Sequence, residues 1–61
     1  MKADDRVRLL EPQSDLPAGA IGVVLGFCPT SEGEGVAVRF GGDGRVVAPE
    51  SLELVEPASA F

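Results

Sequence analysis

The chain has 61 residues, with ten acidic side chains, five basic side chains, a net charge of −5 and no histidine. A chain this short forms one domain with a small core, because it buries only about 60% of the surface that its unfolded form exposes. The negative charge disfavours nucleic acid as a partner, since phosphate backbones repel it, and the lack of histidine leaves the usual zinc and copper ligand sets incomplete.

The composition favours a compact all-β module. Eight glycines and five prolines stand against three phenylalanines and no tryptophan or tyrosine, a balance typical of short strands joined by tight turns. Cys28 is the only cysteine, so no disulfide can form within the chain. No run of about 18 apolar residues marks a membrane span, and no secretory leader is recognisable. We therefore expect a cytoplasmic protein that has no contact with a membrane.

The first predicted strand covers residues 5–10, where apolar and charged side chains alternate. This alternation directs Val7 and Leu9 toward the core. Residues 11–19 contain two prolines and several turn-forming residues, which excludes a helix or a central strand. We expect a loop that ends in a tight turn at Gly19, where glycine tolerates a positive φ.

The second predicted strand, residues 20–27, has the longest alternating pattern in the chain. Its larger apolar side chains, from Ile21 to Phe27, fall on one side of the strand, which we predict to be the buried side. The other side carries Gly22, Val24 and Gly26. Glycine inside a strand costs stability, so its repetition indicates a sharp bend or the close approach of another backbone, as at the corner of a small barrel.

The next two predicted strands are joined by a hairpin. Residues 28–35 are polar and rich in glycine, and we expect them to form the most mobile loop of the protein. Residues 35–40 alternate as a half-buried strand does. Residues 41–44 have the composition of a tight hairpin turn, and the return strand covers residues 45–48.

The end of the chain contains one short turn and one short strand. Pro49 suits the first position of a single 3₁₀ turn over residues 49–52, and residues 53–55 form the last strand. Residues 57–61 have no pattern, and we expect a disordered tail in which Phe61 is either exposed to solvent or docked against another molecule. The predicted core is Val7, Leu9, Ile21, Val23, Leu25, Val36, Val38, Phe40, Val47, Leu52 and Leu54.

Four segments carry a resemblance to known proteins: Asp5-Arg-Val-Arg-Leu9, Gly19-Ala-Ile-Gly-Val-Val24, Val36-Ala-Val-Arg-Phe40 and Ala48-Pro-Glu-Ser-Leu-Glu-Leu54. In this order they resemble SH3-like small barrels, among them short stand-alone bacterial domains, KOW motifs, CarS-type antirepressors that mimic DNA, and small barrel subunits of photosynthetic electron-transfer complexes. The resemblance implies an all-β fold over residues 1–56, a five-stranded SH3-like small barrel with a short 3₁₀ turn before the last strand.

The sequence contains no recognisable catalytic, cofactor or metal site. Catalysis needs a positioned acid, base or nucleophile, and nothing near Cys28 activates its thiol, so we interpret this residue as a partly buried filler. The pairs Asp4 and Asp5, and Glu32 and Glu34, supply too few oxygens at the wrong spacing for a calcium loop. We expect these acids to be solvated and the protein not to be an enzyme.

The leading functional hypothesis is an acidic protein-interaction module, accessory or regulatory, with a protein partner. Weak self-association remains open. The candidate partner-binding residues are acids on the loops and around the last turn: Asp15, Glu32, Glu34, Asp43, Glu50 and Glu53. One alternative is a transcriptional regulator that mimics DNA, in which Asp15, Asp43, Glu50 and Glu53 stand in for phosphates. Another is a small barrel subunit that docks a redox complex.

Overall fold

A computed structural model describes residues 1–13 and 15–58 of the chain. The elements are β1 (Arg6–Leu9), β2 (Ile21–Thr30), β3 (Gly33–Phe40), β4 (Asp43–Val47), η1 (Pro49–Ser51) and β5 (Leu52–Glu56), where η1 is a 3₁₀ turn. The all-β fold class, the five strands and the short 3₁₀ turn before the last strand are thereby confirmed. Within the described residues, no helix has the length and apolar character needed to cross a membrane.

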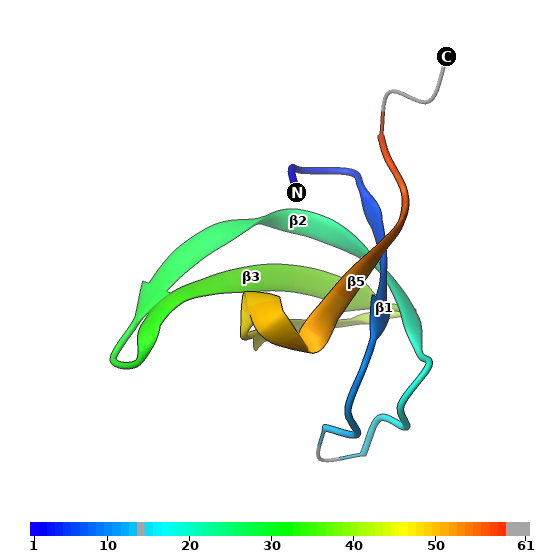
Figure 1. Ribbon diagram of the computed structural model, residues 1–61, viewed down its shortest axis with the longest axis horizontal. Helices are drawn as coiled ribbons and strands as arrows, with labels where there is room; N and C mark the ends of the chain where they lie inside the picture. The colour runs from blue at the N-terminus through cyan, green and yellow to red at the C-terminus, as the bar shows by residue number, and fades with distance from the viewer. Residues whose placement is uncertain (14, 59–61) are drawn as a thin grey trace.

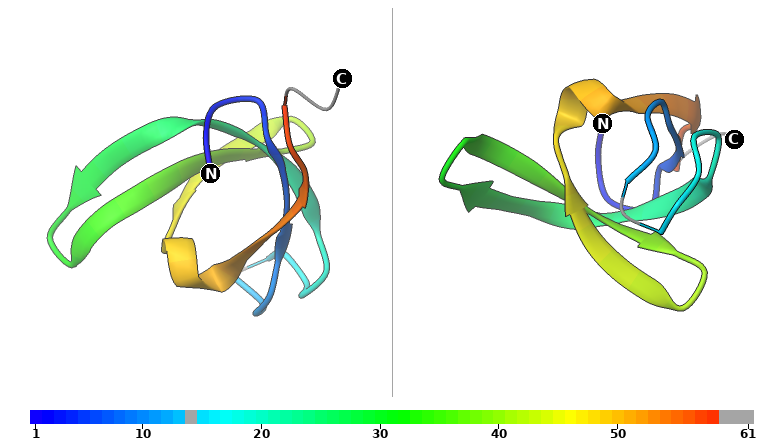
Figure 2. Two further views of the ribbon diagram at one scale, coloured as in Figure 1. Left: turned by 45° about the horizontal axis from the view of Figure 1, so that its top comes forward. Right: turned by 90° about the horizontal axis from the view of Figure 1, so that it is seen from below.

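The five strands form one antiparallel sheet in the order β4-β3-β2-β1-β5. The start of β2 pairs with β1 and the rest of β2 pairs with β3, so this strand joins the two halves of the sheet. The sheet is strongly curved, and η1 carries the chain from β4 across to β5 (Figures 1 and 2). Strands β4 and β5 are its two edges, so the sheet curls without closing into a ring.

Strands β2 and β3 form a long hairpin that extends beyond the rest of the sheet (Figure 1). The predicted mobile loop at residues 28–35 is therefore wrong, because most of it is paired strand. The turn itself is closed by Thr30, whose hydroxyl donates to the Gly33 carbonyl at 2.7 Å and accepts from the Glu32 N–H at 3.2 Å. Glycine and proline are tolerated here because the hairpin is two strands wide and its edges are free.

The buried face of β2 is the opposite of the one predicted. Ile21 and Leu25 are each 52% exposed and Val23 is only half-buried, so none of them belongs to the buried core. Gly22 and Val24 are the buried residues of this part of β2 instead, and they lie on the face that meets the core. From Ile21 to Val24 the side chains alternate as predicted, but the direction of the core is reversed.

The close approach of β2 to β3 explains this reversal. A Cβ atom added to Gly22 would lie 2.6 Å from Val38 Cγ1 and 2.9 Å from the carbonyl oxygen of Arg39, so the inner face has no room for a side chain there. A β-bulge between Val24 and Gly26 then shifts the register and leaves Leu25 outside. Gly22 therefore marks the packed side of β2, where the backbone of β3 comes close.

The core lies inside the curve of the sheet and consists of Val7, Leu9, Val24, Val36, Val38, Phe40, Val47 and Leu52. Seven of these residues were predicted, and Val24 takes the place of its neighbours on β2. Leu54 was also predicted to be buried but is 47% exposed. It lies on the edge strand β5, where it pairs with Val7 on one side only, so no second strand covers it.

Asp5 is buried, which corrects the prediction that it is solvated. The residue is only 2% exposed. Its carboxylate accepts hydrogen bonds from the backbone N–H of Lys2 at 2.8 Å and from that of Ala58 at 2.7 Å. These bonds tie the first turn of the chain to the turn that follows β5. Ala58, at the start of the predicted tail, is therefore anchored, while Phe61 and the rest of the tail from residue 59 lie outside the described residues.

The hydrogen bond from Ala58, then that from Lys2, hold the pKa of Asp5 below its ordinary value of 3.8, helped by the nearby amino terminus. A lowered pKa stabilises the fold above pH 3.8, and this contribution is lost as the pH falls through the lower folded pKa. We expect the free energy of unfolding, measured by urea denaturation, to decrease in this acidic range less steeply in Asp5→Asn than in the parent. Asp4→Asn serves as the control, since Asp4 is exposed. Equal slopes in all three proteins would contradict this role of Asp5.

Candidate functional site

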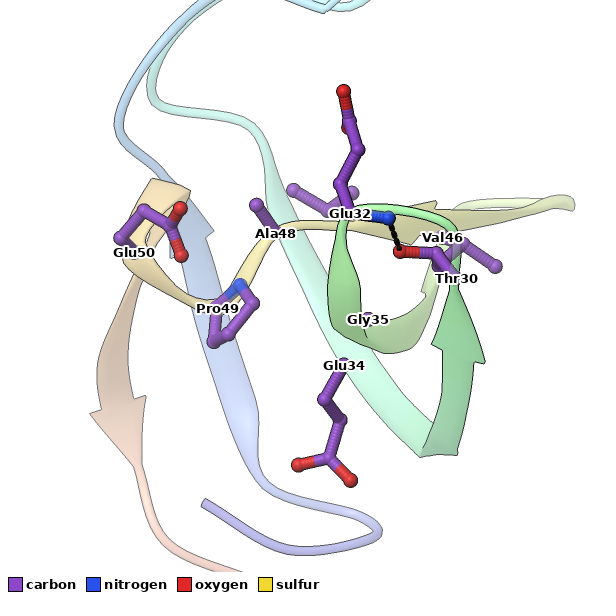
Figure 3. Close-up of a pocket in the computed structure, with 9 residues that line it drawn as sticks. Thr30, Glu32, Glu34, Gly35, Val46, Ala48, Pro49 and Glu50 are labelled. Carbon is purple, nitrogen blue, oxygen red and sulfur yellow. Dashed lines mark hydrogen bonds between the residues drawn. The ribbon is translucent and has the colours of Figure 1, made fainter.

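A cleft of about 180 Å³ lies where β4 ends and η1 begins, beside the tip of the β2–β3 hairpin (Figure 3). We call it the β3–η1 cleft. Its walls include three acidic residues, Glu32, Glu34 and Glu50, and an apolar part made by Val46, Ala48 and Pro49. Its volume is below the range of about 300–1,000 Å³ typical of small-molecule pockets. The cleft is therefore small for a pocket that encloses a whole small molecule.

The cleft exists because β4 is shorter than β3. Strand β3 begins at Gly33, but its last pair with β4 joins Val36 to Val47. If β4 continued in the same register, Pro49 would lie opposite Glu34. Proline has no N–H to donate to a neighbouring strand, and its fixed φ suits the first position of a 3₁₀ turn. The chain therefore leaves the sheet and enters η1, and the edge of β3 is left open.

The three acids of the cleft come from three different elements (Figure 3). Glu32 lies in the turn of the hairpin, Glu34 on β3 and Glu50 on η1, and all three are exposed. Among the ion pairs of the described residues, none involves these side chains. Glu32 and Glu34 point in opposite directions in Figure 3, so they do not form a pair of oxygen ligands.

The other three predicted site residues lie elsewhere. Asp15 forms an ion pair with Arg45 at 2.5 Å, and Glu53 pairs with Arg8 across β1 and β5. Asp43 is exposed at the start of β4, next to the turn that joins it to β3. The structure thus places Glu32, Glu34 and Glu50 around one cleft, with Glu32 and Glu34 directed to opposite sides of it, and separates them from the rest of the predicted acidic surface.

The apolar part of the cleft was not predicted. Val46 is 51% exposed, and its Cγ1 lies over Gly35, only 2.5 Å from where a Cβ of that residue would be. Sequence reasoning assigned Pro49 only to the 3₁₀ turn. A proline directly after a strand indicates that strand pairing ends there. Locating the cleft from this proline also requires the register of β3 and β4, which the sequence alone does not provide.

The cleft combines carboxylates with an apolar surface. Carboxylates attract cationic groups, and the apolar surface beside them favours contact with aliphatic side chains. Cys28 lies outside the cleft on β2, half-buried and with a free thiol. In the part of the chain that the structure describes, no group of three or more potential ligand residues is placed to hold a metal ion.

Comparisons with protein-family models, with curated proteins and with solved structures give no match to this chain.

Proposed function

We propose that this protein is a small, non-enzymatic interaction module of the cytoplasm that binds a basic segment of a protein partner at the β3–η1 cleft. The observation that carries the proposal is the grouping of Glu32, Glu34 and Glu50, without an ion-pair partner among the described residues, around an apolar surface. The element order, with η1 before β5, also supports the proposed relation to SH3-like small barrels.

The distribution of charge supports a basic partner. Three of the five basic side chains of the protein pair with acids outside the cleft: Arg6 with Glu56, Arg8 with Glu53 and Arg45 with Asp15. The carboxylates of the cleft are thus left with excess negative charge. Each exposed carboxylate contributes about 0.2–1 kcal/mol to binding a lysine or arginine, and burial of aliphatic carbon against Val46 and Pro49 adds to this.

The alternative of phosphate mimicry is supported less well. It assigned Asp15, Asp43, Glu50 and Glu53 to the positions of DNA phosphates, and two of these carboxylates are already neutralised by arginines. A basic peptide needs only the local group of acids at the cleft. The peptide is therefore the partner that the arrangement of charges favours.

The peptide acetyl-Ala-Lys-Val-Lys-amide, carrying a neutral dye, tests the proposal by fluorescence anisotropy. We expect the triple variant E32Q/E34Q/E50Q to bind it roughly tenfold more weakly than the parent, because the carboxylates that attract its two lysines are lost. The matched control, D4N/E11Q/D43N, has the same net charge but an unchanged cleft and should bind like the parent. Equal weakening in both variants would show that net charge alone attracts the peptide and would contradict the proposal.

A further inference from the structure

We infer that the basic segment binds as an added β-strand on the edge of β3 at Glu34, antiparallel to β3 and in the line that β4 vacates at Pro49. This inference rests on the proposed function and specifies how the partner is held. Strand addition to an exposed sheet edge supplies affinity from main-chain hydrogen bonds and specificity from alternate side chains.

The register shows which backbone groups are free at this edge. A two-residue turn, Gly41 and Gly42, joins β3 to β4, with a φ of 66° at Gly41, so the flanking residues Phe40 and Asp43 form a hydrogen-bonded pair. Along an antiparallel strand every second residue points its N–H and C=O to the same neighbour. Counting back by twos from Phe40, the N–H and C=O groups of Val38, Val36 and Glu34 face the side of β4. Val36 is the last of these residues that is paired with β4, so the groups of Glu34 face the open edge.

Pro29 leads to the same orientation independently. It lies opposite Glu34 on β2 and has no N–H, so it cannot complete a hydrogen-bonded pair at that position. The N–H and C=O of Glu34 thus point to the cleft side. In the described chain no turn or loop hydrogen bond uses them, and the nearby Ala48 carbonyl accepts the Ser51 N–H at 3.0 Å instead. Pro29 also blocks the opposite edge of the hairpin, whereas the edge at Glu34 is open.

The side chains around this edge define the sequence of the added strand. A residue opposite Glu34 projects on the same face as Glu34, so lysine or arginine is favoured there. Val47, the last residue of β4, occupies the position opposite Val36, so the added strand extends from Glu34 past Gly33 toward Glu32. The free edge of β4 lacks this combination, because Arg45 lies at its middle. The segment is thus a short extended stretch in which basic residues alternate with small or apolar ones.

The test uses two singly N-methylated forms of the shorter probe acetyl-Lys-Val-Lys-amide, whose first lysine begins the added strand opposite Glu34. Methylation of the first lysine nitrogen removes the N–H that would donate to the Glu34 carbonyl, and we expect about three- to tenfold weaker binding. Methylation of the valine nitrogen is the control, since that N–H would point away from β3. We also expect the Glu34 amide to exchange more slowly with solvent when the unmodified probe is bound.

The outcomes separate the inference from the proposed function. If E32Q/E34Q/E50Q weakens binding but the two N-methylated probes bind equally and Glu34 exchange is unchanged, strand addition is overturned and the proposed function stands. If the charge variant binds like the parent, or no basic probe binds at all, both are overturned. Selective loss with the lysine-methylated probe, together with protection of Glu34, supports the added strand.

Discussion

Replacing Gly22 by alanine is expected to lower the free energy of unfolding by about 1–3 kcal/mol, the usual cost of overpacking a core. The added Cβ would meet Val38 Cγ1 at 2.6 Å, Phe40 Cδ1 at 2.9 Å and the Arg39 carbonyl oxygen at 2.9 Å. A side chain can turn aside, but a carbonyl oxygen in a paired strand can move only with its sheet. A domain of this size is stabilised by about 3–5 kcal/mol in total, so the loss is a large fraction of the whole.

The matched control is Gly26→Ala, four residues further along the same strand. No atom lies within 4 Å of a Cβ added at Gly26, so this variant should be as stable as the parent or slightly more stable, because alanine lowers the entropy of the unfolded chain. Urea denaturation followed by circular dichroism measures both. Equal losses of stability in the two variants would contradict the close packing of β3 against Gly22.

An aspartate at Val24 is expected to unfold the protein, whereas an aspartate at the adjacent Leu25 is not. Val24 is fully buried among apolar side chains. A carboxylate placed there has no partner, and the cost of removing it from water exceeds the stability of a domain this small. Leu25 is 52% exposed, so its replacement exchanges one solvated side chain for another.

The two aspartate variants have the same change in charge and differ by one position, which isolates the face of β2 that meets the core. Dispersion of amide signals in a proton–nitrogen NMR spectrum distinguishes a folded from an unfolded chain directly. Val24→Asp should give the narrow spectrum of an unfolded chain, and Leu25→Asp the dispersed spectrum of the parent. The reverse result would restore the orientation of β2 that the sequence alone indicated.

The fold was predictable from the sequence to the level of strand number and order along the chain. Val7 and Leu9 alternate with arginines, so their inward face is unambiguous in β1. In β2 both faces carry apolar or small residues, and hydrophobicity alone then selects the side with larger side chains. The actual choice is made by the distance to β3, which permits only hydrogen at Gly22. That distance is a property of the assembled sheet.

The candidate site was predictable only in part. Glu32, Glu34 and Glu50 were identified as acidic residues outside the core, but so were Asp15 and Glu53, which the fold places next to arginines. Charge pairing depends on contacts between residues far apart in the chain, as between Asp15 and Arg45. Asp5 shows the same limit, since its burial depends on the N–H of Ala58 at the other end of the chain.

The central claim is that the β3–η1 cleft binds a basic peptide, and a titration of the nitrogen-15-labelled protein with acetyl-Ala-Lys-Val-Lys-amide tests it most directly. We predict that saturable amide shift changes concentrate at Glu34, Gly35, Val46 and Glu50, and that the pair of Arg8 with Glu53, on β1 and β5, stays unchanged. Saturable changes centred on β1 and β5, or no saturable change at any amide, would contradict the account.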